Sequence, residues 1–591
     1  MTGFEIRGVP FDKNAVRDWA KDDTRHSNWP IVYVIDGKPD GKPSGGFDDV
    51  YVGETVGGAT RLLQHLDSPG KQHLTQVRVV LDDTFNKSVC LDLESHLIRL
   101  LAGDGAYRVL NRNEGITDSA YYDRELYRES FRDVFEQLRA EGIFTRSIPE
   151  IENSDLFKLS PYKALTTDQA IAVEDIVEGL LADLEKGIGE LLVVQGEPGT
   201  GKTVVAIYLM KLLADIAASK PDDEPDADSI FADFFTEGHR ELLRDFRIGL
   251  VVPQQSLRES IQRVFKRTPG LTPAQVMTPF QVGASEEPWD LLIVDEAHRL
   301  NQRANQASGP MNTKFRVINE TLFGADDTSK TQLDWIRARS RHQIVMVDPE
   351  QSVRPADLPP ELMRSLVEDA KGDGRHYPLV SQMRVKAGDD YIGWVRSILR
   401  PGLPDLDALP AALRTFDGYD LRFFGDLGEM HDAIRQRDAE HGLARLVAGY
   451  AWAWKSKSDP TAHDIELDGR QLRWNTTATD WIASKSSLDE VGSIHTVQGY
   501  DLNYAGVIIG NDLQWNEDAQ RLIVNRSNYF DKKGKENNPT LGKTYSDEDL
   551  LRYICNAYTV LLTRGIRGTY VYVTGRELRA RMATLIRGQR G

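Results

Sequence analysis

Eight residues, Gly196 to Thr203, combine glycines with a lysine and a threonine in the order that phosphate binding requires. An apolar run at 191–194 precedes them, and a helical pattern at 204–213 follows. The glycines let backbone N–H groups curl around phosphate oxygens, and a helix N-terminus adds partial positive charge. We expect Lys202 to reach the β- and γ-phosphates and the Thr203 hydroxyl to ligate Mg²⁺. The loop glycines expected to bind the nucleotide are Gly196, Gly199 and Gly201.

A pair of carboxylates follows a second apolar run downstream of this loop. Residues 291–294 are Leu-Leu-Ile-Val, and Asp295 and Glu296 come directly after them. We expect Asp295 to hold Mg²⁺ through water and Glu296 to orient or activate the water that attacks the γ-phosphate. The predicted chemistry is ATP hydrolysis, with ATP and Mg²⁺ as cofactors.

Two glutamines resemble nucleotide-sensing residues of superfamily 1 helicases. Gln169, ahead of the loop, resembles the adenine-reading glutamine, since a side-chain amide both donates to and accepts from adenine. On its own, such a glutamine is more often a surface residue. A third apolar run, 343–347, ends in Asp348, and Gln351 then resembles the residue that senses the γ-phosphate. Val347 stands where that family usually has glycine.

The C-terminal third holds further resemblances to the same helicases. Arg384, in the segment 379–384, resembles an arginine that reaches the γ-phosphate, and Arg564 resembles a second such finger, with Arg567 as a competitor. Guanidinium suits this role because it is always charged and presents several donors to phosphate oxygens. The segment 494–501 resembles the motif that couples polynucleotide to ATP; its matching residues are Gln498 and Gly499.

Together these motifs span about residues 165 to 573 and resemble the Schlafen group 3 DNA/RNA helicase domain, a superfamily 1 relative. The resemblance implies two RecA-like α/β lobes, 151–375 and 376–591, with ATP bound between them. Closure on ATP would pull the lobes along a nucleic-acid strand. Nucleic acid is the implied partner, and DNA is favoured over RNA.

The N-terminal stretch carries a different set of polar residues. The β-rich segments 30–35 and 50–54 predict a hairpin with a long loop. A helix over 59–66 places Arg61 and His65 on one face, because they are four residues apart. A further helix over 91–101 carries Glu94.

These residues resemble the GIY-YIG nuclease family. Tyr33 lies in the first tripeptide (Val-Tyr-Val) and Tyr51 in the second (Tyr-Val-Gly), separated by a longer loop than is usual. Arg61 matches the family's helix arginine, and Glu94 matches its metal-binding glutamate. Asn111 or Asn113 matches its late asparagine, and His65 matches its variable base. The resemblance implies that Glu94 holds Mg²⁺ or Mn²⁺, that Arg61 neutralises developing charge, and that a tyrosine or neighbouring base helps deprotonate water. The chemistry agrees, because phosphodiester hydrolysis needs a metal, a cation and a proton acceptor.

The composition of the chain limits the classes of protein to which it can belong. The chain has 591 residues, 40% of them hydrophobic, and a formal net charge of −18. That charge argues against a protein that coats nucleic acid, although a local basic channel can coexist with an acidic exterior. Two cysteines are too few for a disulfide framework. No secretory signal or membrane span is visible, so a cytoplasmic location is expected.

The sequence therefore predicts an α/β chain: a small α+β nuclease-like domain at 1–150, then two RecA-like lobes. The predicted function is an ATP-dependent helicase or translocase coupled to a divalent-metal endonuclease, a fusion that suggests prokaryotic antiphage defence or DNA repair. The alternative is an ATP-driven remodelling or sensing protein whose N-terminal domain binds without cutting. Tryptophans between 451 and 489 either stack on bases or pack a core. Oligomeric state, polarity and cleavage specificity stay open.

Overall fold

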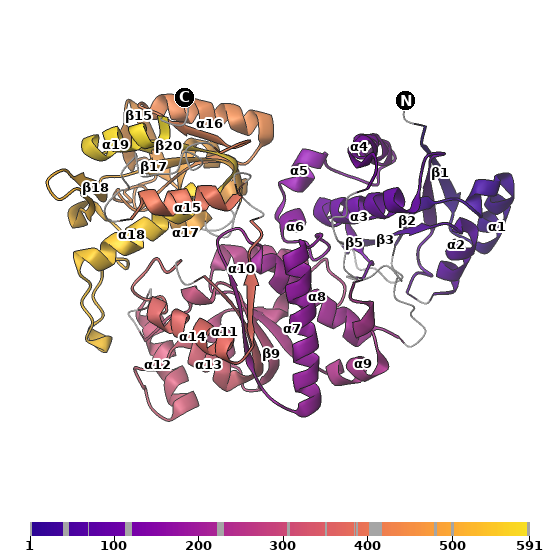
Figure 1. Ribbon diagram of the computed structural model, residues 1–591, viewed down its shortest axis with the longest axis horizontal. Helices are drawn as coiled ribbons and strands as arrows, with labels where there is room; N and C mark the ends of the chain where they lie inside the picture. Colours follow the sequence, from indigo (N-terminus) through magenta and orange to yellow (C-terminus); the bar gives the residue numbers. More distant parts are fainter. Residues whose placement is uncertain are drawn as a thin grey trace. The chain divides into compact units, whose positions relative to one another are not determined.

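The computed structural model describes the chain except for residues 1–2, 39–45, 69, 113–120, 221–229, 304–305, 307, 349–350, 383–384, 386–387, 401–415, 478–480, 498–500 and 588–591. Contacts divide the chain into two compact units. The first consists of Met1–Gly187, Val204–Phe246 and Ser260–Gln275, and the second of Ile188–Thr203, Arg247–Glu259 and Val276–Gly591. Figure 1 traces the elements of each. None of the described helices has the length and apolar character that a membrane crossing requires.

The first unit contains a five-stranded mixed sheet in the order β1-β4-β2-β3-β5. Its central strands, β2 (Ile31–Gly37) and β3 (Asp48–Thr55), pair antiparallel, which confirms the predicted hairpin. The register places Tyr33 opposite Gly53. The other strands are β1 (Glu5–Pro10), β4 (Gln76–Leu81) and β5 (Tyr107–Val109).

Alternation along β2 directs side chains to two separate cores. Val32 and Val34 pack in a cluster with residues of α3 (Lys87–Asp104) and α4 (Arg124–Ala140). Tyr33 packs on the opposite face, in a cluster with residues of α1 (Lys13–Asp22) and α2 (Gly58–Asp67). The sheet thus has helices on both faces, and Tyr33 points toward α2.

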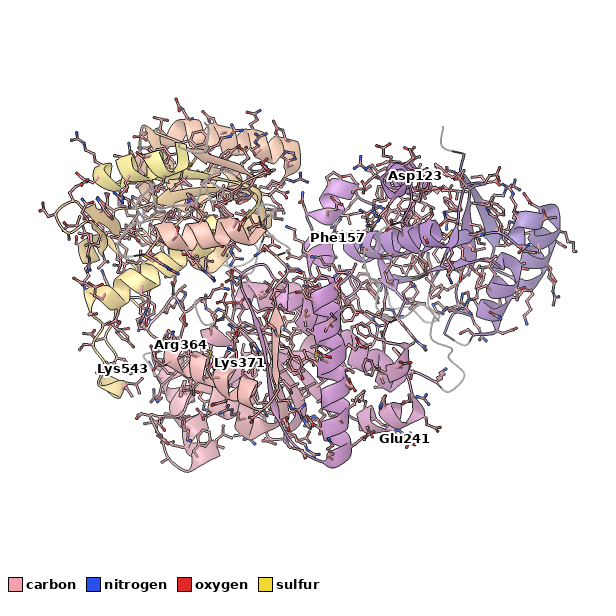
Figure 2. The ribbon with its side chains drawn as sticks, viewed as in Figure 1. Asp123, Phe157, Glu241, Arg364, Lys371 and Lys543 are labelled. Atoms are coloured by element: carbon pink, nitrogen blue, oxygen red, sulfur yellow. The ribbon has the colours of Figure 1, made fainter. Side chains whose placement is uncertain are left out.

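The polar composition of residues 145–160 predicts a linker, but the segment forms two short helices instead. These are α5 (Ile148–Glu152), which a capping box at Ser147 and Glu150 opens, and α6 (Asp155–Lys158). They pack closely on α3, because a Cβ added at Gly103 would lie 2.8 Å from the Phe157 Cβ. Figure 2 labels Phe157 of α6. The helices α7 (Thr167–Lys186) and α9 (Glu237–Leu243) also lie wholly in this unit.

The second unit holds two mainly parallel sheets. The six strands of the first are all parallel, in the order β11-β6-β10-β9-β7-β8. They are β6 (Leu191–Gly196), β7 (Ile248–Val251), β8 (Val276–Met277), β9 (Trp289–Val294), β10 (Ser340–Val347) and β11 (His376–Leu379). Between these strands in the sequence come α8 (Lys202–Ala218) and α10 (Gln255–Phe265), parts of which belong to the first unit. The other helices between them are α11 (Pro279–Gly283), α12 (Gly309–Phe323), α13 (Gln332–Arg339) and α14 (Pro360–Gly372).

The second sheet has the order β12-β20-β17-β13-β16-β15-β14, and only β14 and β15 pair antiparallel. Its strands are β12 (Asp420–Phe423), β13 (Ala444–Ala448), β14 (Ile465–Leu467), β15 (Arg470–Trp474), β16 (Glu490–Ser493), β17 (Leu502–Ile509) and β20 (Gly565–Val573). A separate ribbon pairs β18 (Leu513–Asn516) with β19 (Arg521–Val524). The helices are α15 (Gly388–Ile398), α16 (Leu427–His441), α17 (Ile494–Val497), α18 (Asp547–Leu562) and α19 (Arg576–Arg587).

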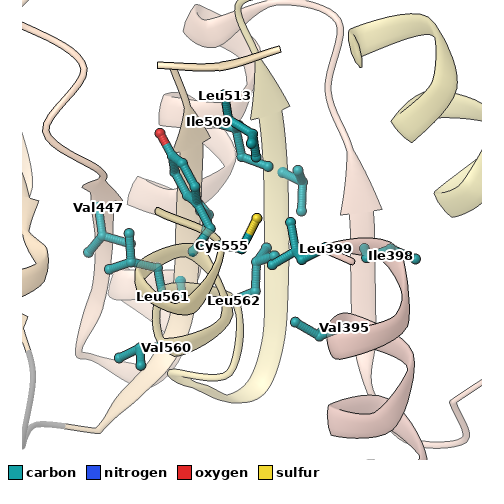
Figure 3. Close-up of a cluster of buried hydrophobic side chains, with 14 of the residues drawn as sticks. Val395, Ile398, Leu399, Val447, Ile509, Leu513, Cys555, Val560, Leu561 and Leu562 are labelled. Carbon is teal, nitrogen blue, oxygen red and sulfur yellow. The ribbon is translucent and has the colours of Figure 1, made fainter. Parts of the chain in front are cut away.

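Apolar side chains join the helices to this sheet. Figure 3 shows Val395 and Ile398 of α15 near Leu562 of α18 in one buried cluster. Trp474 and Trp481 are fully buried, which favours core packing over base stacking for both. Parallel sheets alternating with helices confirm the predicted α/β class and are consistent with RecA-like lobes.

Candidate functional site

The loop after β6 has the backbone shape that its glycines predict. Gly199 and Gly201 have φ values of +91° and +82°, a left-handed conformation that favours glycine. A Cβ at Gly196 would lie 2.3 Å from the Thr200 hydroxyl oxygen, so this position also requires glycine. Lys202 folds back over the loop, and its Nζ donates to the carbonyls of Gly196 (2.6 Å) and Glu197 (3.0 Å). The lysine therefore lies within the phosphate cradle.

The carboxylate pair meets this loop. β6 and β9 both flank β10 in the parallel sheet, so their carboxyl ends lie at one edge. There the Thr203 hydroxyl donates to Asp295 Oδ2 at 2.8 Å. Burial, and then the charge on Glu296, raise the pKa of Asp295 above its usual value. Thr203 and Asp295 supply hard oxygen donors side by side, which fits Mg²⁺.

Glu296 is paired with a histidine that the sequence motifs left without a role. His298 Nε2 lies 2.9 Å from Glu296 Oε2, and the histidine is fully buried. Burial would raise the pKa of Glu296, but His298, followed by the charges of Lys202 and Arg564, holds it below its usual value. Glu296 is therefore ionised at neutral pH, as a carboxylate that orients water should be.

The other predicted motor residues differ in their hydrogen-bond partners. Gln351 is buried, and its amide donates to Asp348 Oδ2 at 2.7 Å. Gln169 is also buried, and its Oε1 accepts from the Thr166 backbone N–H in the capping box that opens α7. Arg384, Gln498 and Gly499 lie outside the described residues.

Two residues that the prediction did not include contact the phosphate loop. The Gln382 amide donates to the Pro198 carbonyl at 2.7 Å, and Arg396 pairs with Glu197.

The second candidate site surrounds Tyr33, which is buried on β2. His65 Nε2 lies 2.8 Å from the Tyr33 hydroxyl, and the Tyr51 ring lies 4.9 Å from the His65 ring. Arg61 hydrogen-bonds to Tyr33, and the charge of Glu94 acts on the same hydroxyl. Burial, followed by Tyr51, raises the pKa of Tyr33 well above its usual value. The structure thus brings together five of the six residues that matched the nuclease pattern.

Asn111, the sixth, is bound to the backbone of β3. Its Oδ1 accepts from the Val52 N–H at 3.1 Å, and its Nδ2 donates to the Val52 carbonyl at 2.8 Å. The amide thus fixes the strand between Tyr51 and Gly53. Its alternative, Asn113, lies outside the described residues.

Gly53 is required for a steric reason that can be tested. A Cβ at this position would lie 2.2 Å from the Tyr33 hydroxyl oxygen and 2.4 Å from the ring carbon that bears it. We expect Gly53→Ala to displace the Tyr33 ring and to lower the nucleic-acid cleavage that the sequence predicts about a hundredfold, because misplacement by about 1 Å costs that much. ATP hydrolysis should be unchanged. Substitution of the half-buried Gly57 by alanine is the control, because nothing lies within 4 Å of its added Cβ. Equal cleavage by the two variants would contradict this account.

Among the described residues, no group of three or more His, Cys, Asp or Glu side chains forms a cation cage. Magnesium sites at phosphoryl groups commonly use one or two carboxylates, waters and the substrate's own phosphates. Thr203 with Asp295 matches that sparse arrangement.

A match that covers more than half of the chain shows its family. Residues 189–575 match the family described as Schlafen group 3, DNA/RNA helicase domain. The chain belongs to this family. The Schlafen group 3 match begins just before β6 and ends two residues after β20, so it covers both parallel sheets.

Comparison with individual proteins adds distant relatives. The Schlafen group 3 chain is similar to an uncharacterized protein of Saccharomyces cerevisiae, with 25% identity over an alignment of 413 residues that covers 66% of this chain and 83% of the relative. Two solved structures of the arterivirus nonstructural protein 10 helicase, one in complex with DNA, each share 12% identity over 67% of this chain, with TM-scores of 0.27 and 0.25. The chain spans 62% and 63% of those two helicase chains.

Proposed function

We propose that the chain is an ATP-driven nucleic-acid motor, a helicase or translocase. The observation that carries this proposal is the contact between Thr203 and Asp295, because it joins the phosphate loop to the acid-bearing strand at one edge of a parallel sheet. In this proposal, Lys202 contacts the nucleoside triphosphate and Glu296 contacts its attacking water. ATP and Mg²⁺ are the proposed cofactors, and nucleic acid, with DNA favoured, is the proposed partner.

Several of the predicted motor residues that the structure describes have a proposed role. Lys202 binds the β- and γ-phosphates, Thr203 and Asp295 hold Mg²⁺, and Glu296 orients water. Gln351 senses the γ-phosphate through the position that Asp348 gives it. The capping contact of Gln169 fixes its side chain at the start of α7, from where we propose that it reads adenine.

Arg564 is proposed as an arginine finger in preference to Arg567. Arg564 is buried, and its charge lowers the pKa of Glu296, whereas the charge of Arg567 acts on Tyr504. We expect Arg564→Ala to lower nucleic-acid-stimulated ATPase kcat by about a hundred- to a thousandfold, the cost of removing one charge-stabilising donor. Arg567→Ala is the control and should retain the rate. A steady-state ATPase assay with and without DNA measures both variants, and the reverse result would contradict the assignment.

We further propose that residues 1–150 form a divalent-metal endonuclease of the GIY-YIG type, and that 151–375 and 376–591 are the two motor lobes. The arrangement around Tyr33 supports the first of these. It places a cation, Arg61, and an imidazole, His65, on a buried tyrosine hydroxyl that also feels the charge of Glu94. We propose that Glu94 holds Mg²⁺ or Mn²⁺ there and that Arg61 stabilises negative charge on the phosphate.

A nuclease joined to such a motor suits genome defence or repair. In the alternative function, the N-terminal domain grips nucleic acid and the motor remodels it without cutting. The first function predicts nucleic-acid cleavage that depends on Glu94, and the alternative predicts no cleavage. Substitution of Glu94 tests this difference directly.

A further inference from the structure

Lys71 lies beside two residues of the candidate nuclease site. Its Nζ is 3.0 Å from His65 Nδ1 and 3.2 Å from the centre of the Tyr51 ring. It is half-buried in the turn after α2, outside the motifs that point to the site. On the far side of the imidazole, His65 Nε2 lies 2.8 Å from the Tyr33 hydroxyl. Three side chains thus form a chain of contacts from Lys71 through His65 to Tyr33.

The chemistry of the three groups fixes the direction of the hydrogen bonds. An ammonium has three donors and no acceptor, so Lys71 donates and His65 Nδ1 accepts. A neutral imidazole without a proton on Nδ1 carries it on Nε2. Burial, and then the charges of Lys71 and Arg61, lower the pKa of His65 to about 2, so the ring is neutral. The Nε2–H therefore donates to the oxygen of Tyr33.

This direction decides what Tyr33 can do. The Tyr33 oxygen accepts from His65 and also from Arg61, whose guanidinium has only donors. The hydroxyl proton of Tyr33 is consequently directed away from both groups. His65 cannot take that proton, because its Nε2 already carries one.

We propose that Lys71 is a positioning residue of the nuclease site, which fixes His65 as the Nε2–H tautomer and so makes His65 a hydrogen-bond donor to Tyr33. This role rests on the proposed nuclease function. The cation–π contact with Tyr51 orients the same ammonium, so that Lys71 links both tyrosines. At metal sites, the partners that orient a histidine through its second ring nitrogen typically contribute about tenfold to a hundredfold in activity, and we expect a contribution of that size here.

The tautomer can be measured without any substrate. The full-length protein labelled with ¹⁵N-histidine would be compared with Lys71→Met and Lys71→Arg by two-bond ¹H–¹⁵N correlation, with His65→Gln identifying the signal. We expect His65 to be a single Nε2–H tautomer in the wild type and in Lys71→Arg, whose guanidinium can still donate. Lys71→Met should show a mixture of tautomers. An unchanged spectrum in Lys71→Met would overturn the inference.

Kinetics supply the second readout. We expect Lys71→Met to lower the kcat of cleavage by about tenfold to a hundredfold with little change in KM, and Lys71→Arg to restore part of it. Unchanged ATPase would show that the motor is intact, and an unchanged thermal unfolding curve would show that the part of the chain around Lys71 is folded. A rise in KM with kcat retained would make Lys71 a phosphate-binding residue and overturn the inference. If wild type and Lys71→Met cut equally while Glu94→Gln is inactive, the inference fails alone. If the wild type cuts no substrate, the nuclease proposal fails, and the tautomer measurement still decides whether Lys71 sets the state of His65.

Discussion

Glu296→Gln is expected to abolish nearly all ATP hydrolysis while ATP binding is retained. Glutamine keeps the shape of the side chain but cannot carry the negative charge that His298, Lys202 and Arg564 stabilise. A group that orients or activates the attacking water contributes about a hundred- to ten-thousandfold, so we expect kcat to fall within that range. The phosphate loop and the pair formed by Thr203 and Asp295 stay intact, so affinity for a fluorescent ATP analogue should change little.

The control for this variant is Glu361→Gln at an exposed position of α14, where the glutamate contacts Arg364 on the surface. Stopped-time phosphate release and equilibrium fluorescence titration would be run on both variants. Near-wild-type hydrolysis by Glu296→Gln would contradict the role assigned to this carboxylate. If Glu296→Gln lost both ATP binding and hydrolysis, the negative charge of Glu296 would instead maintain the conformation of the phosphate loop.

Glu94→Gln is expected to remove metal-dependent cleavage and to leave the motor intact. An amide is a weaker ligand for Mg²⁺ than a carboxylate. A bound cation stabilises the negative charge of the transition state by several kcal/mol. Because each 1.4 kcal/mol is about tenfold in rate, cleavage should fall by about a thousandfold or more. The ATPase rate and its stimulation by nucleic acid should be those of the wild type.

Glu125→Gln, at an exposed position in the first turn of α4, is the matched control in the same part of the chain. It should cut at the wild-type rate with Mg²⁺ or Mn²⁺. Gel-resolved cleavage of end-labelled single-stranded, duplex and forked substrates measures both. Equal cutting by the two variants would exclude Glu94 as the metal ligand.

Much of the motor site could be predicted because its signals are local in the sequence. The glycines, Lys202 and Thr203 lie within eight residues, and parallel strands bring Asp295 to the same edge. His298 follows Glu296 by two residues, yet its role depends on a turn in which Glu296 has a positive φ of 50°, which the sequence does not reveal. The capping contact of Gln169 was readable, since threonine and glutamine three residues apart are typical of a capping box.

The nuclease-like site depended more on tertiary structure. The register of β2 and β3 explains why Gly53 must lack a side chain, and only the folded hairpin shows that register. Lys71 could not be identified from spacing, because it meets Tyr51 from a turn twenty residues later in the chain. Residues 145–160 were expected as a linker, but Ile148, Ile151 and Phe157 supply apolar contacts to the core, and that spacing was the available signal.

The most direct test of the central claim, that one chain carries two separable active sites, is a paired assay of cleavage and ATP hydrolysis on the same labelled DNA and RNA substrates. Wild type, Glu94→Gln and Glu296→Gln would be compared with Mg²⁺, with Mn²⁺ and after chelation by EDTA. We predict that the wild type cuts only with metal, that Glu94→Gln hydrolyses ATP without cutting, and that Glu296→Gln loses hydrolysis while its nuclease site still cuts in the absence of ATP. Cleavage that persists in Glu94→Gln, or a wild type that hydrolyses ATP and cuts no substrate, would contradict the account.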